Sequence, residues 1–245
     1  MIFENLEEKR RRIGTLSLAL IDPDLKNDNN LGRILENINK SEFDAILVGG
    51  SSIQDNKFGE RIKIIKSSTD LPVIIFPGGA AQISSNADAI LFTSLISGRN
   101  PRFLIEEQVK SSLRIYNSSL EVIPTGYILL KTDKKSAVEI VSNTNPLPMD
   151  DLPSILSHAL AAQYLGKKIL FLEAGSNSNY PANEGLIREI SSVLDIPIIV
   201  GGGIKKKEDA KKISKSGASY IVIGSLLEES IDHLELLDIN NAVHS

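Results

Sequence analysis

Short runs of apolar, mostly β-branched residues alternate along the chain with longer amphipathic stretches. Several of the short runs lack polar alternation, which is typical of parallel strands buried on both faces. The runs predict eight strands, Leu16–Ile21, Ala45–Val48, Val73–Phe76, Ala89–Phe92, Tyr127–Leu130, Ile169–Leu172, Ile198–Val200 and Tyr220–Ile223. The amphipathic stretches predict helices at Leu31–Ile38, Phe58–Ser67, Arg102–Ile115, Ser154–Leu165, Glu184–Val193 and Lys207–Ser216, with a closing helix from Leu226.

Strands that alternate with helices in this way predict a parallel sheet with crossover connections. Eight strands favour a (β/α)₈ TIM barrel, an α/β fold, over an open doubly wound sheet. The 245 residues agree with the roughly 250 that are typical of such barrels. No linker or short-period repeat divides the chain, so we predict one domain over residues 1–245. The third helix should lie in Gly78–Asp88, but the glycines and the Ser-Ser-Asn run there predict an irregular segment.

Composition narrows the functional classes. Lys and Arg number 27 against 31 Asp and Glu, and the net charge of −4 argues against a nucleic-acid partner. The chain has no cysteine, which excludes disulfides, thiol nucleophiles and iron–sulfur clusters. No apolar run approaches the roughly 20 residues of a membrane-spanning helix, and no signal-peptide pattern follows the charged Met1–Arg12 segment. We therefore expect a cytoplasmic protein with a solvated first helix.

The last two predicted strands both end in glycine. Ile198–Val200 leads into Gly201–Gly203, and Tyr220–Ile223 leads into Gly224 and Ser225. In TIM barrels the loops after strands 7 and 8 frequently bind phosphate. Glycine lets backbone N–H groups approach an anion, and a helix N-terminus adds attraction. Glycines also make plain turns, but two such strand ends side by side favour a phosphate site.

Oxygen-bearing side chains follow three other predicted strands. Glu173 follows strand 6, where a carboxylate can accept a proton from a substrate hydroxyl or form a structural ion pair. We expect its charge to persist, because a hydroxyl donor favours the ionised carboxylate. Asp22 follows strand 1 and Ser51 follows strand 2. Protein oxygens together with substrate phosphates suffice to bind Mg²⁺. The Asp-Pro-Asp pattern at Asp22 is also common in turns, but its position opposite the phosphate site favours a metal site.

A series of short motifs, in this order and over most of the chain, resembles the geranylgeranylglyceryl phosphate synthases. The motifs are Leu20–Asp24, Val48–Ser51, Ile75–Gly78, Ala87–Phe92, Ser94–Pro101, Ile123–Tyr127, Ala159–Gly166, Phe171–Ser176 and Gly201–Ile204. Ile21–Asp24, Phe76–Gly78 and Arg99–Pro101 are similar to the archaeal branch usually called group II. The related group I carries a lysine two positions before the metal-binding aspartate, where this chain has Leu20.

The resemblance implies a Mg²⁺-dependent prenyltransferase that joins sn-glycerol 1-phosphate to geranylgeranyl diphosphate. It would release diphosphate and form the first ether bond of archaeal membrane phospholipids. Asp22 and Ser51 are implied as magnesium ligands. The implied glycerol phosphate site comprises Phe171, Leu172, Glu173, Ala174, Gly175, Ser176, Asn177, Gly202, Gly203, Gly224 and Ser225. Two positions depart from the family pattern, since Asn177 stands where the family usually has Gly and Ser225 where it usually has Asn.

In the expected reaction a glycerol hydroxyl attacks the allylic C1 of the prenyl diphosphate. Glu173 would orient or deprotonate this hydroxyl, and Mg²⁺ at Asp22 would neutralise the departing diphosphate. Tyr127, which we place at the start of the fifth strand, either steadies an allylic cation with its ring or packs the barrel. The segment Gly78–Asp88 would leave an apolar groove for the prenyl tail.

Partners and alternatives follow from the same residues. Apolar residues in the outer helices Phe103–Ile115 and Ala159–Leu165 favour a homo-oligomer, and a lipid product allows transient contact with a membrane surface. The alternative function is another phosphate-binding TIM-barrel enzyme, an isomerase or synthase of small phosphorylated metabolites. A non-catalytic phosphate-binding barrel is less favoured, because both Asp22 and Glu173 follow predicted strands.

Overall fold

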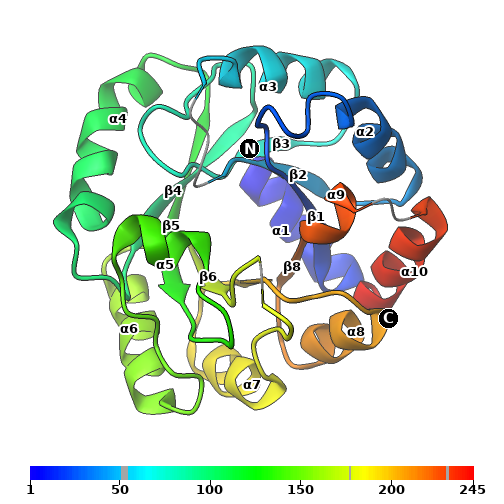
Figure 1. The fold of residues 1–245 in the computed structure, drawn as a ribbon. Coiled ribbons are helices and arrows are strands. Elements are labelled where there is room, and N and C mark those ends of the chain that lie inside the picture. The colour runs from blue at the N-terminus through cyan, green and yellow to red at the C-terminus, as the bar shows by residue number, and fades with distance from the viewer. Residues whose placement is uncertain (51–54, 177, 230–231) are drawn as a thin grey trace.

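The computed structural model describes residues 1–50, 55–176, 178–229 and 232–245. Eight parallel strands follow one another around a closed barrel, and β8 pairs with β1 to complete it (Figure 1). The strands are β1 Leu16–Ile21, β2 Ala45–Val48, β3 Val73–Ile75, β4 Ala89–Leu95, β5 Glu121–Leu129, β6 Ile169–Glu173, β7 Ile198–Gly201 and β8 Tyr220–Ile223. The predicted TIM barrel is confirmed.

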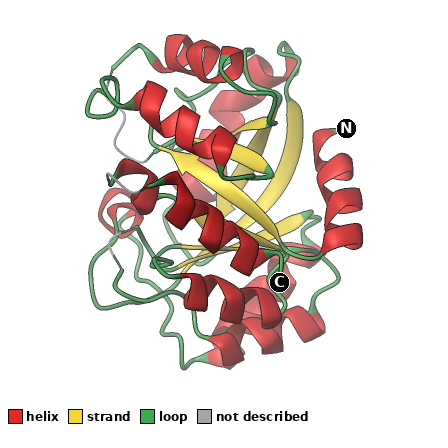
Figure 2. Ribbon diagram, turned by 90° about the vertical axis from the view of Figure 1, so that its right-hand side faces the viewer, coloured by secondary structure: helices red, strands yellow, loops and turns green. Residues whose placement is uncertain are grey.

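Helices surround the barrel, as Figures 1 and 2 show. The helices of the outer layer are α2 Leu31–Lys40, α3 Phe58–Ser67, α4 Glu107–Tyr116, α6 Leu152–Tyr164, α7 Glu184–Val193, α8 Lys207–Lys215 and α10 His233–Val243. A π-helical turn, η1 Arg102–Glu106, precedes α4, and the short helix α9 Ser225–Glu228 follows β8. In the described part of the chain, no helix is both long and apolar enough to cross a bilayer.

The first helix, α1 Ile2–Ile13, covers the end of the barrel at which the strands begin. Leu6 is buried in the barrel interior, and Glu7 accepts a hydrogen bond of 2.6 Å from the hydroxyl of Tyr220. The backbone amides of Ile2 and Phe3 donate to Glu121 at the start of β5. The expectation of a solvated first helix is therefore wrong for one of its faces, which closes the barrel.

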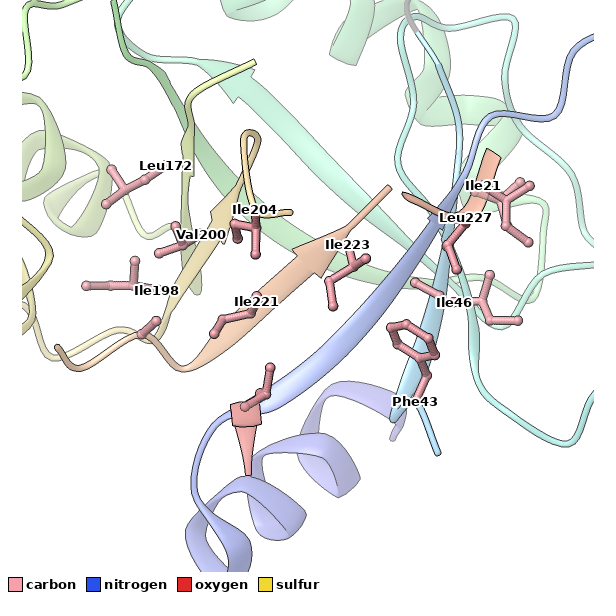
Figure 3. Close-up of a cluster of buried hydrophobic side chains, with 14 of the residues drawn as sticks. Ile21, Phe43, Ile46, Leu172, Ile198, Val200, Ile204, Ile221, Ile223 and Leu227 are labelled. Carbon is pink, nitrogen blue, oxygen red and sulfur yellow. The ribbon is translucent and has the colours of Figure 1, made fainter. Parts of the chain in front are cut away.

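Apolar side chains fill both faces of the strands. In β8, Tyr220 and Val222 lie in the barrel interior, whereas Ile221 and Ile223 pack outward against the helices. Figure 3 shows part of this outer layer, with Val200 of β7 near the two isoleucines of β8. Burial of both faces explains why the strand sequences lack polar alternation.

Two connections differ from a regular barrel. Residues 76–88, all of them described, form turns without a helix, so the predicted irregular third helix is confirmed. The segment is held by side chains instead: the Gln82 side chain accepts from Gly78 N at 3.0 Å and donates to Gly50 O at 2.6 Å. The connection after β5 contains a helix that the sequence interpretation missed, α5 Ala137–Ser142. Its Ser136 cap accepts a 3.0 Å hydrogen bond from Glu139 N, in a Ser-x-x-Glu pattern that signals a helix start.

The fifth strand begins earlier than predicted. The predicted strand starts at Tyr127, but β5 begins at Glu121 and includes Pro124 and Gly126, residue types that disfavour strand interiors. Tyr127 therefore lies near the C-terminal end of β5, and its placement at the start of the strand was wrong. At its actual position, the phenol ring lies close to the end of the barrel where active sites occur.

Candidate active site

A cavity of about 440 Å³ opens at the C-terminal end of the barrel strands. Its lining comes from residues that follow β1, β2, β3, β6, β7 and β8, together with parts of β4, α4 and α5. Most of the residues predicted for the site meet here. Those that line the cavity are Asp22, Glu173, Gly175, Ser176, Gly202, Gly203, Gly224 and Ser225. Residues far apart in the chain thus share one concave surface, as in other TIM-barrel active sites.

Three other predicted residues lie beside the cavity but do not line it. Phe171 is in the barrel interior, where its ring stacks on Phe76 with centroids 4.9 Å apart. Leu172 points the other way, into the outer layer, so its side chain cannot reach a bound substrate. Ala174 is buried, and its backbone amide donates to Gly201 O at 2.9 Å. The remaining two predictions, Ser51 and Asn177, lie outside the described residues.

Glu173 is packed against the backbone of two neighbouring loops. Its Oε1 accepts a hydrogen bond of 2.5 Å from Gly175 N, and a Cβ on Gly202 would lie only 2.5 Å from the same oxygen. Burial raises the pKa of Glu173 to about 7 from its ordinary value of 4.5, and the Gly175 hydrogen bond opposes this rise. The expected charge of Glu173 concerns the complex with a substrate hydroxyl and stays a prediction; in the protein alone, burial favours the protonated carboxyl group. A carboxyl group with this pKa is suited to exchange protons near neutral pH.

Glycine is required by geometry where the last strands end. Gly202 and Gly203 have φ angles of 84° and 71°, in the left-handed region. A Cβ on Gly203 would lie 2.3 Å from the carbonyl oxygen of Tyr180. Next to them, Gly224 precedes α9, whose first residue is Ser225. Backbone and a serine hydroxyl thus border this part of the cavity, in the arrangement that commonly binds phosphate in TIM barrels.

The sequence interpretation placed Asp22 opposite the phosphate site, but Asp22 follows β1, which pairs with β8, so it lies beside α9 on the neighbouring side of the cavity. Its Oδ1 is buried and has no hydrogen-bond partner among the described residues, and a Cβ on Gly50 would lie 2.2 Å from it. Its Oδ2 is 3.6 Å from Nζ of Lys26, which also lies 3.0 Å from Oε2 of Glu228. Burial, and next the charge of Asp24, raise the pKa of Asp22 to about 6. A cation bound at Oδ1 would therefore stabilise the charged form of Asp22.

The residues around Asp22 determine which metal ion could bind there. Among the described residues, no group of three His, Cys, Asp or Glu side chains could hold a metal ion. Mg²⁺ does not need such a cage, because it keeps several waters and often binds through one or two carboxylates plus substrate phosphates. The unpartnered, buried Oδ1 of Asp22 fits such a shared site.

The sequence interpretation missed Lys26 and Glu228. Lys26 stands four residues after Asp22, and Glu228 belongs to α9. Both line the cavity. The spacing of Asp22 and Lys26 is a weak local signal, whereas the proximity of Glu228 arises only when β8 closes against β1.

The cavity continues into an apolar part between β3 and α4. Phe76, Ile83, Phe92 and Phe103 line it, and the irregular segment after β3 forms one wall. Tyr127 also lines the cavity, with its ring centroid 5.9 Å from that of Phe76, and it is only 5% exposed. Burial, and then the charge of Glu173, raise the pKa of Tyr127 well above its ordinary value, so the phenol stays neutral.

Comparison with known proteins agrees with this geometry. Residues 6–242 match the model of the PcrB family. A Zunongwangia profunda protein named geranylgeranylglyceryl phosphate synthase is 43% identical over 213 residues, which are 87% of this chain and 91% of the relative. A Thermoplasma acidophilum protein of the same name is 39% identical over 237 residues, which are 96% of this chain and 92% of the relative.

A solved structure is similar along the whole chain. It is the crystal structure of (S)-3-O-geranylgeranylglyceryl phosphate synthase from Thermoplasma acidophilum in complex with the substrate sn-glycerol-1-phosphate. The TM-score is 0.91 at 36% identity, and the match covers 100% of this chain and 98% of that one. The resemblance drawn from the sequence motifs is confirmed, and the chain belongs to the PcrB family.

Proposed function

We propose that this protein is a geranylgeranylglyceryl phosphate synthase. It joins sn-glycerol 1-phosphate to geranylgeranyl diphosphate, releases diphosphate and forms the first ether bond of archaeal-type membrane phospholipids. The observation that carries the proposal is a single cavity with three different parts. A glycine-bordered end, the buried Glu173 and the Asp22 carboxylate adjoin an apolar groove. A small phosphorylated metabolite would leave that groove unused, which disfavours the other classes of phosphate-binding barrel enzyme.

The two substrates fit adjoining parts of the cavity. Glycerol phosphate binds with its phosphate at Gly203, Gly224 and Ser225, so its hydroxyls extend toward Glu173. The prenyl tail occupies the apolar part beside Phe76, and its diphosphate lies toward Asp22. Asp22 and Ser51 would hold Mg²⁺, which supplies positive charge to the departing diphosphate. The exposed amine of Lys26 lies beside Asp22 and adds a second cation at the same end.

The chemical step transfers the prenyl group from one oxygen to another. A new bond forms between the glycerol oxygen and the allylic C1, while the bond from C1 to the diphosphate oxygen breaks with its electron pair. The hydroxyl proton passes to the carboxylate of Glu173, whose pKa of about 7 suits it to accept a proton near neutral pH. The ring of Tyr127 borders the cavity near Glu173, where its face can stabilise positive charge at C1.

Product formation tests the proposal directly. The purified protein is incubated with labelled sn-glycerol 1-phosphate or its sn-3 enantiomer, a series of prenyl diphosphates, and either Mg²⁺ or a chelator. We expect label to enter the organic phase with the sn-1 compound, geranylgeranyl diphosphate and Mg²⁺ together. Absence of labelled lipid with every prenyl diphosphate, while the protein remains folded, would refute the function.

We also infer that the protein forms a homo-oligomer. On η1 and α4, the side chains of Ile105, Val109, Leu113 and Tyr116 follow the spacing of one helix face, and their exposure ranges from 57% to 84%. An apolar stripe of this kind is unusual on a free surface. A second copy of the chain could cover it in a symmetric contact.

A further inference from the structure

Arg61 of α3 is an almost buried cation that contacts two loops at the cavity end of the barrel. Its side chain is only 4% exposed. Nε and Nη2 donate to the two carboxylate oxygens of Asp28 at 2.5 and 2.9 Å. Nη1 and Nη2 donate to the two carboxylate oxygens of Asp55, both at 2.7 Å. A fifth hydrogen bond, of 2.9 Å, runs from Nη1 to the carbonyl oxygen of Pro23.

These contacts use every N–H donor of the guanidinium group. Two of the three partners belong to the loop that follows β1, and Asp55 belongs to the connection between β2 and α3. The hydrogen bonds from Arg61 hold the pKa values of Asp28 and Asp55 below their usual range, so both carboxylates stay charged. The guanidinium therefore ties the loop after β1 to the loop after β2.

The tied segment is the one that carries Asp22. Pro23, whose carbonyl binds Arg61, directly follows Asp22. On the other side, the carbonyl of Asp22 itself accepts a hydrogen bond of 2.8 Å from Asn27 Nδ2. The peptide groups at Asp22 and Pro23 are thus each fixed by a side-chain donor, and this limits the directions in which the Asp22 carboxylate can point.

Stability alone does not account for this arrangement. Burying the Arg61 guanidinium carries a desolvation cost, and an apolar side chain of similar volume often stabilises a fold as well or better. Lysine would supply the charge but not the planar fork that two carboxylates and a carbonyl require here. The hydrogen bonds of Arg61 fix the position of the loop that follows β1.

We propose that Arg61 is a positioning residue, which holds the Asp22 loop in the geometry that receives the cation and the diphosphate group. The inference rests on the proposed function, because it concerns the metal-binding end of that site. Arg61 acts through Pro23 and the loop, since it does not line the cavity. Groups that orient a metal ligand are worth roughly 10–100-fold in metal affinity.

The test compares Arg61→Lys and Asp55→Asn with Lys66→Gln. Lys66 is a matched control on the same helix, where its Nζ makes an ion pair of 2.7 Å with Asp88 at the opposite end of the barrel. Mn²⁺ binding in the presence of inorganic diphosphate is followed by electron paramagnetic resonance. Amide hydrogen exchange is measured over residues 22–28, and the KM values of both substrates are determined.

Arg61→Lys should weaken Mn²⁺ binding by about 10-fold or more, speed exchange over residues 22–28 and raise the KM for the prenyl diphosphate. The KM for glycerol phosphate should stay within about twofold, because the hydrogen bonds of Arg61 go to Pro23, Asp28 and Asp55 and none of these residues belongs to the loops after β6, β7 and β8. Asp55→Asn keeps Arg61 and Asp28, so its changes should have the same direction and be smaller. Lys66→Gln should leave Mn²⁺ binding and exchange in the loop unchanged.

Wild-type Mn²⁺ affinity and wild-type exchange in Arg61→Lys would overturn the inference. Equal increases in both KM values with unchanged Mn²⁺ binding would do so too, because they would indicate a general structural role. Failure of the proposed function looks different, since the wild-type protein would then form no prenylated product. The exchange and Mn²⁺ measurements need no turnover, so they report on Arg61 in either case.

Discussion

Glu173→Gln should make the protein more stable at alkaline pH while it removes most of the activity. The substitution keeps the size of the side chain and an oxygen that can accept the hydrogen bond from Gly175. It removes the ionisable group from a position that is 9% exposed. Glu173 lies against the backbone of Gly201 and Gly202, and burial disfavours its charged form more than the Gly175 hydrogen bond favours it, so ionisation destabilises the fold.

The size of this effect follows from the pKa. The pKa of Glu173 rises from 4.5 to about 7 on folding, and each pKa unit corresponds to about 1.4 kcal/mol. Between these two values the folded state holds a proton that the unfolded state has lost, so the free energy of unfolding falls as the pH rises. The full cost, at most about 3.5 kcal/mol, is present above pH 7 and absent below pH 4.5.

Urea unfolding of both proteins at pH 5 and pH 8 measures the difference. We expect Glu173→Gln to match the wild type near pH 5 and to exceed it at pH 8 by about 1–3 kcal/mol. Its kcat should fall by about 10²–10⁴-fold, the usual contribution of a general base. Glu189→Gln, at an exposed position of α7, serves as the control and should show no pH-dependent gain.

Two results would refute this reasoning about Glu173. Equal stability of the two proteins at both pH values would show that the carboxyl group ionises in the fold without cost. Near-normal kcat with a raised KM for glycerol phosphate would show that Glu173 positions the substrate and does not accept its proton.

Three further predictions concern other parts of the molecule. Asp22→Asn should remove most Mg²⁺-dependent turnover and leave the circular dichroism spectrum unchanged; full activity with excess chelator would contradict it. Gly203→Ala should weaken glycerol phosphate binding at least tenfold, which corresponds to about 1.4 kcal/mol, because the added Cβ would lie 2.3 Å from the Tyr180 carbonyl oxygen. Calorimetry measures this affinity. Leu113→Arg should shift the protein toward monomer in light scattering, and a wild type that is already monomeric would exclude the proposed α4 contact.

Much of the fold could be predicted because the physical signal for it is local. The strands are buried on both faces, so each leaves a continuous apolar run such as Ile198–Val200. The errors occurred where that signal is interrupted. Pro124 and Gly126 concealed the first half of β5, and α5 is too short to show a helical period. Side chains alternate along a strand, so an inward Phe171 requires the side chain of Leu172 to point outward.

The candidate site could be predicted only in part, for a related reason. Residues that follow strands converge at one end of any parallel barrel, which is why Asp22 and Glu173 could be placed in one cavity. The partners of those residues come from distant segments. The hydrogen bonds from Arg61 to Asp28, across 33 residues, and from Asn27 to Glu228, across 201, arise from side-chain directions that no local pattern encodes.

The two polar parts of the cavity are formed in different ways, one by backbone and the other by charged side chains, and they should respond differently to substitution. At the phosphate end, backbone geometry at Gly202 and Gly203 shapes the site, so neighbouring side chains can vary. At the Asp22 part, charged side chains shape the site, and Lys26 and Arg61 bind partners from other segments. Substitutions there disturb several contacts at once, so this end should tolerate fewer of them.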